Sequence, residues 1–316
     1  MPRVESLTFV RPPYSNADDI VPKYFAVHIS NFFGRFLRMR GSMKTFLRRL
    51  CGLPVILMVT PLLMAQWAPI PTRGVPKGAD GKPDMHGAAP RTADGKPDLS
   101  GIWENDRPAA ADAPATQPRP DTPPLASFGD IGKGFKDGLP IQPWVADLVK
   151  KRMADNSKDN PDAHCLPMGN MQFHNHPQPR KIIQTPDAIY IIYEANSGLR
   201  QIFMDGRPLP SKDADPWWYG YSVGKWEGDT LVVETIGFRD DVWLDVRGTP
   251  LTNEGKTIER FRRPNYGSLE IDVTVDDPKA YTRPWTVRIN QHVMLDTELI
   301  EFICEDRDAT HYVGSE

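Results

Sequence analysis

Short segments rich in β-branched and aromatic residues follow one another from residue 180 to residue 304, and this pattern limits the fold more than any other feature. Nine segments fit strands: RKIIQT, AIYIIYE, LRQIFM, YGYSVGKW, TLVVETIG, TIERFRR, SLEIDVTV, WTVRINQHVM and ELIEFIC. Brief turn sequences such as Pro-Asp, Asp-Gly and Glu-Gly-Asp separate them, and no crossover helix fits between them. The spacing therefore predicts antiparallel strands joined in chain order.

One of these segments, SLEIDVTV at 268–275, alternates between apolar and polar residues. A period of two places Leu269, Ile271 and Val273 on one face of a sheet whose other face meets solvent. Because nine strands in an open sheet would leave exposed edges, we expect a mainly β fold in which an antiparallel meander closes into a lipocalin-like barrel, with a β-sandwich as the alternative. Upstream, Gly-Ile-Trp-Glu at 101–104 resembles the first-strand signature of lipocalin-type barrels.

The segment 43–65 has the three parts of a secretory signal peptide: a basic start, an apolar run, and a Leu-Met-Ala cleavage site before Gln66. The apolar run has about 15 residues, fewer than the roughly 20 that span a bilayer, so we expect no stable membrane anchor. Residues 1–42 are expected to be an over-extended start. The sequence thus predicts an exported protein, either periplasmic or secreted.

The charge of the expected mature chain excludes one class of partner. Without residues 1–65 the chain keeps 29 Lys and Arg against 38 Asp and Glu, a net charge of −9. Binding to nucleic acid would need a basic surface that neutralises phosphates, and the one basic cluster, ERFRRP at 259–264, is short and interrupted. We therefore expect no nucleic-acid partner.

Many of the 32 prolines fall between residues 69 and 143, where missing amide donors make a packed core hard to build. We expect residues 66–140 to be a Pro/Gly-rich arm and linker in which ADGKPD occurs twice, at 79–84 and 93–98. Residues 141–316 would then form a single β domain. This domain should begin with a short amphipathic helix that starts at Pro143.

Cys165 and Cys304 are the cysteines that remain after signal removal. In an exported protein such a pair predicts a disulfide, which would close a long loop between the start and the end of the β domain. The alternative is a nucleophilic Cys165 activated by His164, which would need a free thiolate.

Several longer motifs resemble a large family of exported proteins of soil and other environmental bacteria whose activity is not established. The motifs that carry the resemblance are PRTADGKPDLSGIW, CLPMGNMQFHNHPQPRKIIQTP, IFMDGRPLP, GYSVGKWEGDTLVVETIGF, ERFRRPNYGSLEIDVTVDDPKAYTRPWT and DTELIEFICEDRD. The resemblance implies a common fold over residues 90–312 and supplies no catalytic residues. The chain departs from the family at 305–308, where Glu-Asp-Arg-Asp replaces an Asn-rich stretch.

Two histidines, His174 and His176, stand one residue apart before the first of these strands. An extended backbone would point both rings to one side, as two metal ligands require, with His164, His292 or His311 as a third ligand. They could instead act as acid and base groups at a barrel mouth, or be a polar pair in a Pro-flanked loop. No carboxylate or cysteine stands at an established metal spacing nearby, so we assign no metal. No cofactor is expected either, because phosphate loops and dinucleotide fingerprints are missing from the sequence.

A run of aromatic residues, WWYGY at 217–221, is the second candidate site. Such residues fill β cores or line pockets for apolar or ring-bearing ligands. We predict that Trp217, Trp218, Tyr219, Tyr221 and Arg200 bind a ligand. The candidate catalytic residues are His174, His176, Tyr219 and Arg207. Both histidines are predicted to line a pocket shared with residues 217–221.

Three functions follow from these residues. The first is an exported barrel that binds a small apolar or aromatic molecule, which needs only the fold and the aromatic residues. The second is a lyase, isomerase or hydrolase, which also needs titratable groups that converge on a pocket. The third is a carbohydrate-binding or surface-interaction module.

Overall fold

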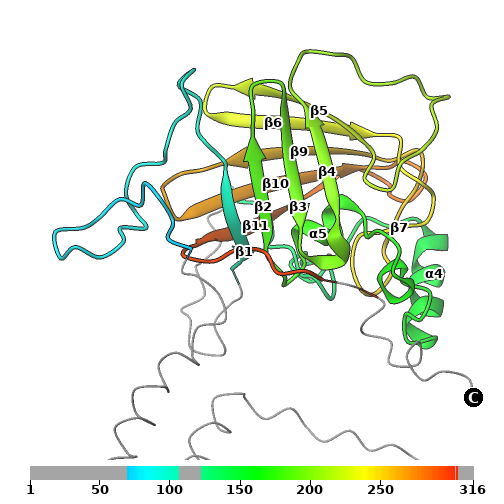
Figure 1. Ribbon diagram of the computed structural model, residues 1–316. Coiled ribbons are helices and arrows are strands. Elements are labelled where there is room, and N and C mark those ends of the chain that lie inside the picture. Colours follow the sequence, from blue (N-terminus) through cyan, green and yellow to red (C-terminus); the bar gives the residue numbers. More distant parts are fainter. Residues whose placement is uncertain (1–69, 107–121, 303, 305–316) are drawn as a thin grey trace, which may run out of the picture. The chain divides into compact units, whose positions relative to one another are not determined.

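The computed structural model describes residues 70–106, 122–302 and 304, and nine of its strands form a closed barrel (Figure 1). In spatial order these strands are β1 (Gly101–Asn105), β11 (Trp285–Met294), β10 (Ser268–Asp276), β9 (Lys256–Arg262), β6 (Thr230–Ile236), β5 (Tyr221–Glu227), β4 (Leu199–Phe203), β3 (Ala188–Tyr193) and β2 (Arg180–Gln184). Strands β7 (Val242–Trp243) and β8 (Pro250–Leu251) form a separate pair. The predicted mainly β barrel is confirmed. The predicted signal peptide and over-extended start lie outside the described residues.

The prediction of the last strand is wrong. ELIEFIC, at 298–304, forms no strand where it is described, and β1 takes the ninth place in the barrel by pairing with both β11 and β2. The barrel is therefore closed without residues 298–304. This segment runs outside the barrel, where Ile300 is 70% exposed. Strand β1 comes from the segment expected to be an arm and linker. Its Trp103 is fully buried, and the guanidinium carbon of Arg263 lies 4.8 Å from the centre of that ring.

The expectation of antiparallel pairing throughout is wrong for one pair of strands. Strands β4 and β5 are parallel, and only Ile202 with Ser222 and Phe203 with Val223 face each other. Their connection, residues 204–220, must return from one end of the barrel to the other, because parallel strands begin at the same end. Strands β2, β4 and β5 consequently run in one direction. The residues that precede β2 and those that precede β5 therefore lie at the same barrel end.

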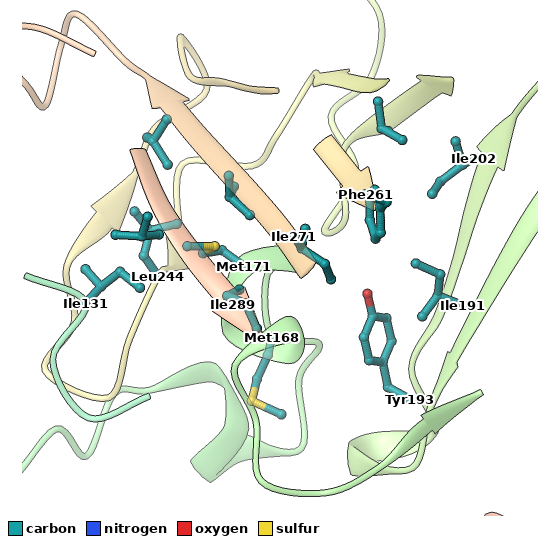
Figure 2. Close-up of a cluster of buried hydrophobic side chains, with 14 of the residues drawn as sticks. Ile131, Met168, Met171, Ile191, Tyr193, Ile202, Leu244, Phe261, Ile271 and Ile289 are labelled. Atoms are coloured by element: carbon teal, nitrogen blue, oxygen red, sulfur yellow. The ribbon is translucent and has the colours of Figure 1, made fainter. Parts of the chain in front are cut away.

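Helix α5 (Asn170–His174) lies at this end of the barrel, which we call the α5 end. Away from it, the barrel interior is apolar: Figure 2 shows Ile191, Ile202, Phe261 and Ile271 gathered in the core. Alternation within the strands places these side chains inward, since every second residue of a strand faces the same side. Near α5 the inward positions are polar instead. The barrel is thus filled by side chains, with an apolar part and a polar part.

Helix α4 (Pro143–Ala154) is the predicted short helix, and it packs outside the barrel. Proline occupies its first turn, where an amide donor is not needed, and Val145 is its fully buried residue. Trp144 Nε1 donates a hydrogen bond to the carbonyl oxygen of Lys279, and Arg152 Nη1 donates to that of Gly248. Two 3₁₀ turns follow, Pro161–His164 and Ala195–Ser197. Among the described helices none has the length and apolar character required to cross a membrane.

The duplicated ADGKPD sequence forms two similar tight loops. Gly81 and Gly95 have φ values of 78° and 80°, which glycine adopts without strain, and each loop closes through the same pattern of backbone hydrogen bonds. The second loop is attached to the barrel because Arg91 pairs with Asp229 in the β5–β6 turn, at 2.6 Å between Nη2 and Oδ2.

The predicted disulfide between Cys165 and Cys304 is confirmed. The two Cα atoms are 5.5 Å apart, within the usual range for a disulfide. The bond connects the turn before α5 with the segment that follows the last barrel strand. Cys165 is therefore not a free nucleophile.

Candidate functional site

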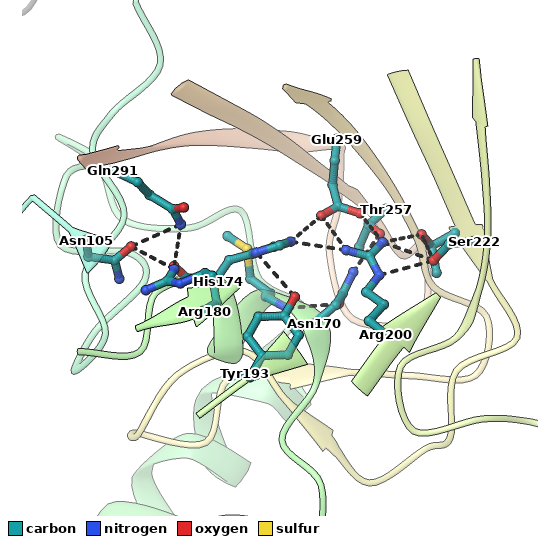
Figure 3. Close-up of polar contacts among 12 residues, drawn as sticks. Asn105, Asn170, His174, Arg180, Tyr193, Arg200, Ser222, Thr257, Glu259 and Gln291 are labelled. Carbon is teal, nitrogen blue, oxygen red and sulfur yellow. Dashed lines mark hydrogen bonds and ion pairs between the residues drawn. The ribbon is translucent and has the colours of Figure 1, made fainter. Parts of the chain in front are cut away.

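A buried polar cluster occupies the α5 end of the barrel, and Glu259 of β9 is at its centre (Figure 3). Its Oε1 accepts a hydrogen bond from Arg200 Nη1 of β4 at 2.9 Å and lies 2.7 Å from His174 Nε2 of α5. Its Oε2 accepts from Arg200 Nη2. All three side chains are at most 1% exposed. Residues far apart in the sequence thus meet in one buried ion pair with an imidazole beside it.

Hydroxyl groups from the neighbouring strands complete the cluster. Arg200 Nε donates to Ser222 Oγ at 3.2 Å, and Arg200 Nη2 donates to Thr235 Oγ1 at 3.0 Å. Tyr193 Oη lies 3.4 Å from His174 Nδ1 on the other side of the imidazole. These contacts fix the rotamer of each charged group, as a buried ion pair requires if its polar atoms are to be satisfied.

The protonation states follow from burial and from the ion pair. Burial lowers the pKa of His174, although the hydrogen bond to Glu259 acts in the opposite direction. Burial alone would raise the pKa of Glu259, but Arg200 and His174 outweigh it and lower that pKa to about 2. A neutral His174 that donates from Nε2 to Glu259 Oε1 fits the shortest of its contacts, and Nδ1 then accepts from Tyr193. Arg200 Nη1, which lies 3.1 Å from Nε2 and can only donate, then donates to Glu259 Oε1. The cluster then holds one positive and one negative charge.

Arg180 of β2 holds the histidine loop in place. Its Nη1 donates to Asn105 Oδ1 at 3.0 Å and to the carbonyl oxygen of His174, and its Nη2 donates to the carbonyl oxygen of His176 at 3.0 Å. Burial lowers the pKa of Arg180 to about 10. Gln291 Nε2 donates to the same carbonyl of His174 at 3.2 Å. The backbone around both histidines is therefore fixed from inside the barrel.

The two histidines occupy different environments. His174 is the last residue of α5, whereas His176 follows the helix, is 8% exposed and lies edge-on to Phe128 with 4.8 Å between ring centroids. His176 Nδ1 accepts a hydrogen bond from the amide of Gln178. Of the proposed third ligands, His164 contacts the Lys158 carbonyl, His292 pairs with Asp106, and His311 is outside the described residues. Within the described ranges no three His, Cys, Asp or Glu side chains are placed to hold a metal ion.

Two of the four aromatic residues predicted to bind a ligand, Trp217 and Tyr221, lie in a row with Phe203 on the outside of β4 and β5. Trp217, 48% exposed, lies 5.2 Å from Tyr221 between ring centroids, and Tyr221 lies 4.9 Å from Phe203. The guanidinium carbon of Arg207 lies 3.9 Å from the ring centre of Phe203, and Arg207 is held by Asp205 and by Tyr221 Oη. Arg207 is thus a surface residue that is separate from the buried cluster.

Trp218 and Tyr219 point elsewhere. Burial raises the pKa of Tyr219 to about 12, and this side chain packs against the edge of the core. Trp218 lines a cleft of about 340 Å³ outside the barrel, together with Trp243 of β7 and with Leu148 and Arg152 of α4. Of the residues predicted from the sequence to bind a ligand or catalyse a reaction, only Trp218 lines this cleft.

Each tryptophan of this cleft is covered on one face by an arginine. The guanidinium carbon of Arg239 lies 4.5 Å from the ring centre of Trp218, and that of Arg152 lies 4.3 Å from the ring centre of Trp243. Cation–π contacts of this kind hold an indole in one orientation. Sequence reasoning missed Trp243, Arg152 and Glu259. The period of two within TIERFRR, which places Glu259 beside the inward Phe261, was the available signal for the glutamate.

Comparison of this chain with protein-family models, with curated proteins and with solved structures finds no match. The geometry of the two candidate regions, the buried cluster and the tryptophan cleft, is therefore the basis for a function.

Proposed function

We propose that this chain is an exported protein that binds a small aromatic molecule in the cleft between Trp218 and Trp243. One observation carries the proposal: two indoles from separate segments of the chain meet in a cleft of about 340 Å³. Sites for small molecules commonly have about 300–1,000 Å³ and are lined by aromatic side chains with a few polar groups. Leu148, Leu166 and Pro161 add apolar surface, and Arg152 and Asp241 add polar groups.

Export is the second part of the proposal. It rests on the signal peptide that the sequence predicts at 43–65 and on the bond between Cys165 and Cys304. Disulfides persist in oxidising compartments such as the periplasm and the cell exterior. Mass spectrometry of the protein from the periplasm or the medium should give a chain that starts near Gln66, and a mature chain that keeps residues 1–65 would refute this part.

Binding is favoured over catalysis because of the burial of His174. A general base must reach the proton that it removes, and the imidazole of His174 is 1% exposed with both nitrogens in contact with protein groups. His176 is fixed against Phe128, and Arg207 is held on the surface by Asp205 and by Tyr221 Oη. The burial of His174 and the fixed position of His176 therefore support a binding protein rather than an enzyme.

The binding site can be tested with two adjacent tryptophans. Ligand-observed NMR with indole and 4-methylphenol should detect binding to the wild-type protein, whereas cyclohexanol, which lacks an aromatic face, should bind more weakly. We expect Trp218→Ala to weaken indole binding at least about tenfold, which equals about 1.4 kcal/mol. Trp217→Ala is the matched control, because Trp217 does not line the cleft. Equal effects of the two substitutions, or no binding of any aromatic probe, would refute the proposal.

A further inference from the structure

A second cleft, of about 530 Å³, lies along α4, and the helix separates it from the tryptophan cleft. The helix contributes Val149, Lys150 and Met153 to the second cleft, but Leu148, Lys151 and Arg152 to the first. Neighbouring residues of one helix thus line two different hollows, because consecutive side chains point about 100° apart around a helix. Residues outside the helix, among them Leu139, Ile141 and Arg247, line the rest of the second cleft.

Apolar side chains form much of the second cleft. Leu139, Ile141 and Val149 are only partly buried, and Met153 is 45% exposed. The Met153 sulfur accepts a hydrogen bond from Arg247 Nε at 3.1 Å, which holds the thioether over the cleft. Partly exposed apolar groups gathered around one hollow indicate a surface that gains free energy when an apolar group covers it.

The charges in this cleft are not balanced. Both oxygens of Asp130 are occupied, because Oδ1 accepts from the amide of Gly132 and Oδ2 pairs with Arg247 Nη1. Lys150 forms no ion pair or hydrogen bond with any residue that the structure describes, and Arg247 Nη2 has no acceptor in that part of the chain. The charges of Asp130 and Arg247 cancel, so Lys150 gives the cleft a net positive charge. Lys150 Nζ and Arg247 Nη2 are the two groups that can donate to a ligand.

We propose that this second cleft binds an amphipathic monocarboxylate. Its apolar part would lie against Leu139, Ile141, Val149 and Met153, and its carboxylate would accept hydrogen bonds from Lys150 Nζ and Arg247 Nη2. Arginine and lysine are the usual partners of a carboxylate, and a flexible methionine adapts to apolar chains of different shape. The proposal is independent of the function proposed for the tryptophan cleft.

The two clefts differ in a way that predicts selectivity. Asp155, Asp159 and Asp241 line the tryptophan cleft, where they outnumber Lys151 and Arg152. A carboxylate there would meet like charges, whereas in the second cleft it meets an excess of positive charge. We therefore expect a monocarboxylate to bind more tightly in the second cleft, on the side of α4 that carries Lys150, than in the tryptophan cleft.

The test uses octanoate as the probe and 1-octanol as its uncharged counterpart, with binding followed by NMR of the amides of Ala146 and Val149 and of the Met153 methyl group. Octanoate should shift these resonances, with an affinity that decreases as NaCl is added. Octanol should bind more weakly. Lys150→Glu should weaken octanoate binding about tenfold, because it removes an attraction and adds a repulsion of similar size.

Lys151→Glu is the matched control, because it makes the same charge change one residue away in the other cleft. It should leave the affinity for octanoate within about twofold of wild type. Both lysines are exposed, so neither substitution should prevent folding. Equal effects of the two substitutions, equal binding of octanol and octanoate, or shifts confined to residues of the tryptophan cleft would overturn the proposal. Indole binding is measured on the same variants. If it is weakened by Trp218→Ala but not by Lys150→Glu, the proposed function of the tryptophan cleft stands even when the octanoate proposal fails.

Discussion

At the scale of single residues, Glu259 is the group on which the buried polar cluster depends. Glu259→Gln would remove the negative charge that faces Arg200 while keeping nearly the same volume. An unpaired guanidinium would then remain in the barrel interior, and breaking a buried pair in this way costs about 3–5 kcal/mol. We expect a loss of that size in the free energy of unfolding, measured by urea denaturation. Glu227→Gln, in an exposed pair with Arg260, is the control and should have a much smaller effect, because solvent screens the pair.

The pH dependence of stability should reveal His174. Its pKa is 6.5 in an ordinary setting and is lowered by burial in the folded chain, so below pH 6.5 the unfolded chain binds a proton that the folded chain does not. The free energy of unfolding should therefore decrease as the pH falls through 6.5, by up to about 1.4 kcal/mol per pH unit. His174→Gln should remove this slope between pH 7 and pH 5. The same slope in the variant would show that another group titrates.

Glu259 acts at lower pH, in the same direction. Its pKa is about 2 in the folded chain against 4.5 as the reference value. The carboxylate therefore contributes stability that is complete above about pH 4.5 and is lost as the pH falls toward 2. The cluster of Glu259, Arg200 and His174 could not be predicted from the sequence, because its members lie 26 and 59 residues from Arg200. Alternation places Arg200 and Glu259 inward, whereas His174 comes from α5, and pairing across the barrel decides which of them meet.

At the scale of elements, the start of β5 depends on Gly220. Its φ is 65°, and a Cβ there would lie 2.6 Å from Thr235 Cγ2 and 2.7 Å from Phe238 Cε1. Gly220→Ala should cost about 1–3 kcal/mol for backbone strain and a similar amount for overpacking. Gly237→Ala is the control, since its φ is 72° but nothing lies within 4 Å of the new Cβ. The free energies of unfolding of the two variants, measured by thermal or urea denaturation, should differ by the cost of overpacking. Equal free energies would show that the contacts of the new Cβ at position 220 cost nothing.

Alternation predicted eight of the barrel strands, because each must present one apolar face to the core. It failed at 298–304, where the same pattern occurs but both neighbouring ladder positions, on β11 and β2, are taken by β1. It also could not show that β4 and β5 are parallel, because side-chain alternation is the same in parallel and antiparallel strands. Element type was therefore predictable, whereas pairing depended on the closure of the whole barrel.

At the scale of the whole molecule, the tryptophan cleft could be predicted only in part. The sequence indicated Trp218, but its partners Trp243 and Arg152 come from β7 and α4, which are placed by packing outside the barrel. The two histidines lie at the same barrel end as Trp218 only because the connection from β4 to β5 runs the length of the barrel. No short sequence pattern predicts that this connection runs the length of the barrel. A common barrel end does not by itself make a common pocket. The pocket that we predicted to contain both histidines and residues 217–221 stays a prediction.

The disulfide joins distant parts of the chain, because it closes a loop with a sequence separation of 139 residues. Replacing Cys165 and Cys304 together by serine should lower the free energy of unfolding by about 2–5 kcal/mol, since the unfolded chain regains the freedom that the bond removes. Denaturation of the oxidised protein, the reduced protein and the double variant measures this loss. The reduced protein and the variant should agree within about 1 kcal/mol. If reduction changes the free energy of unfolding by less than about 1 kcal/mol, the barrel that β1 closes does not depend on the disulfide. The bond would then only fix the local position of the segment after β11.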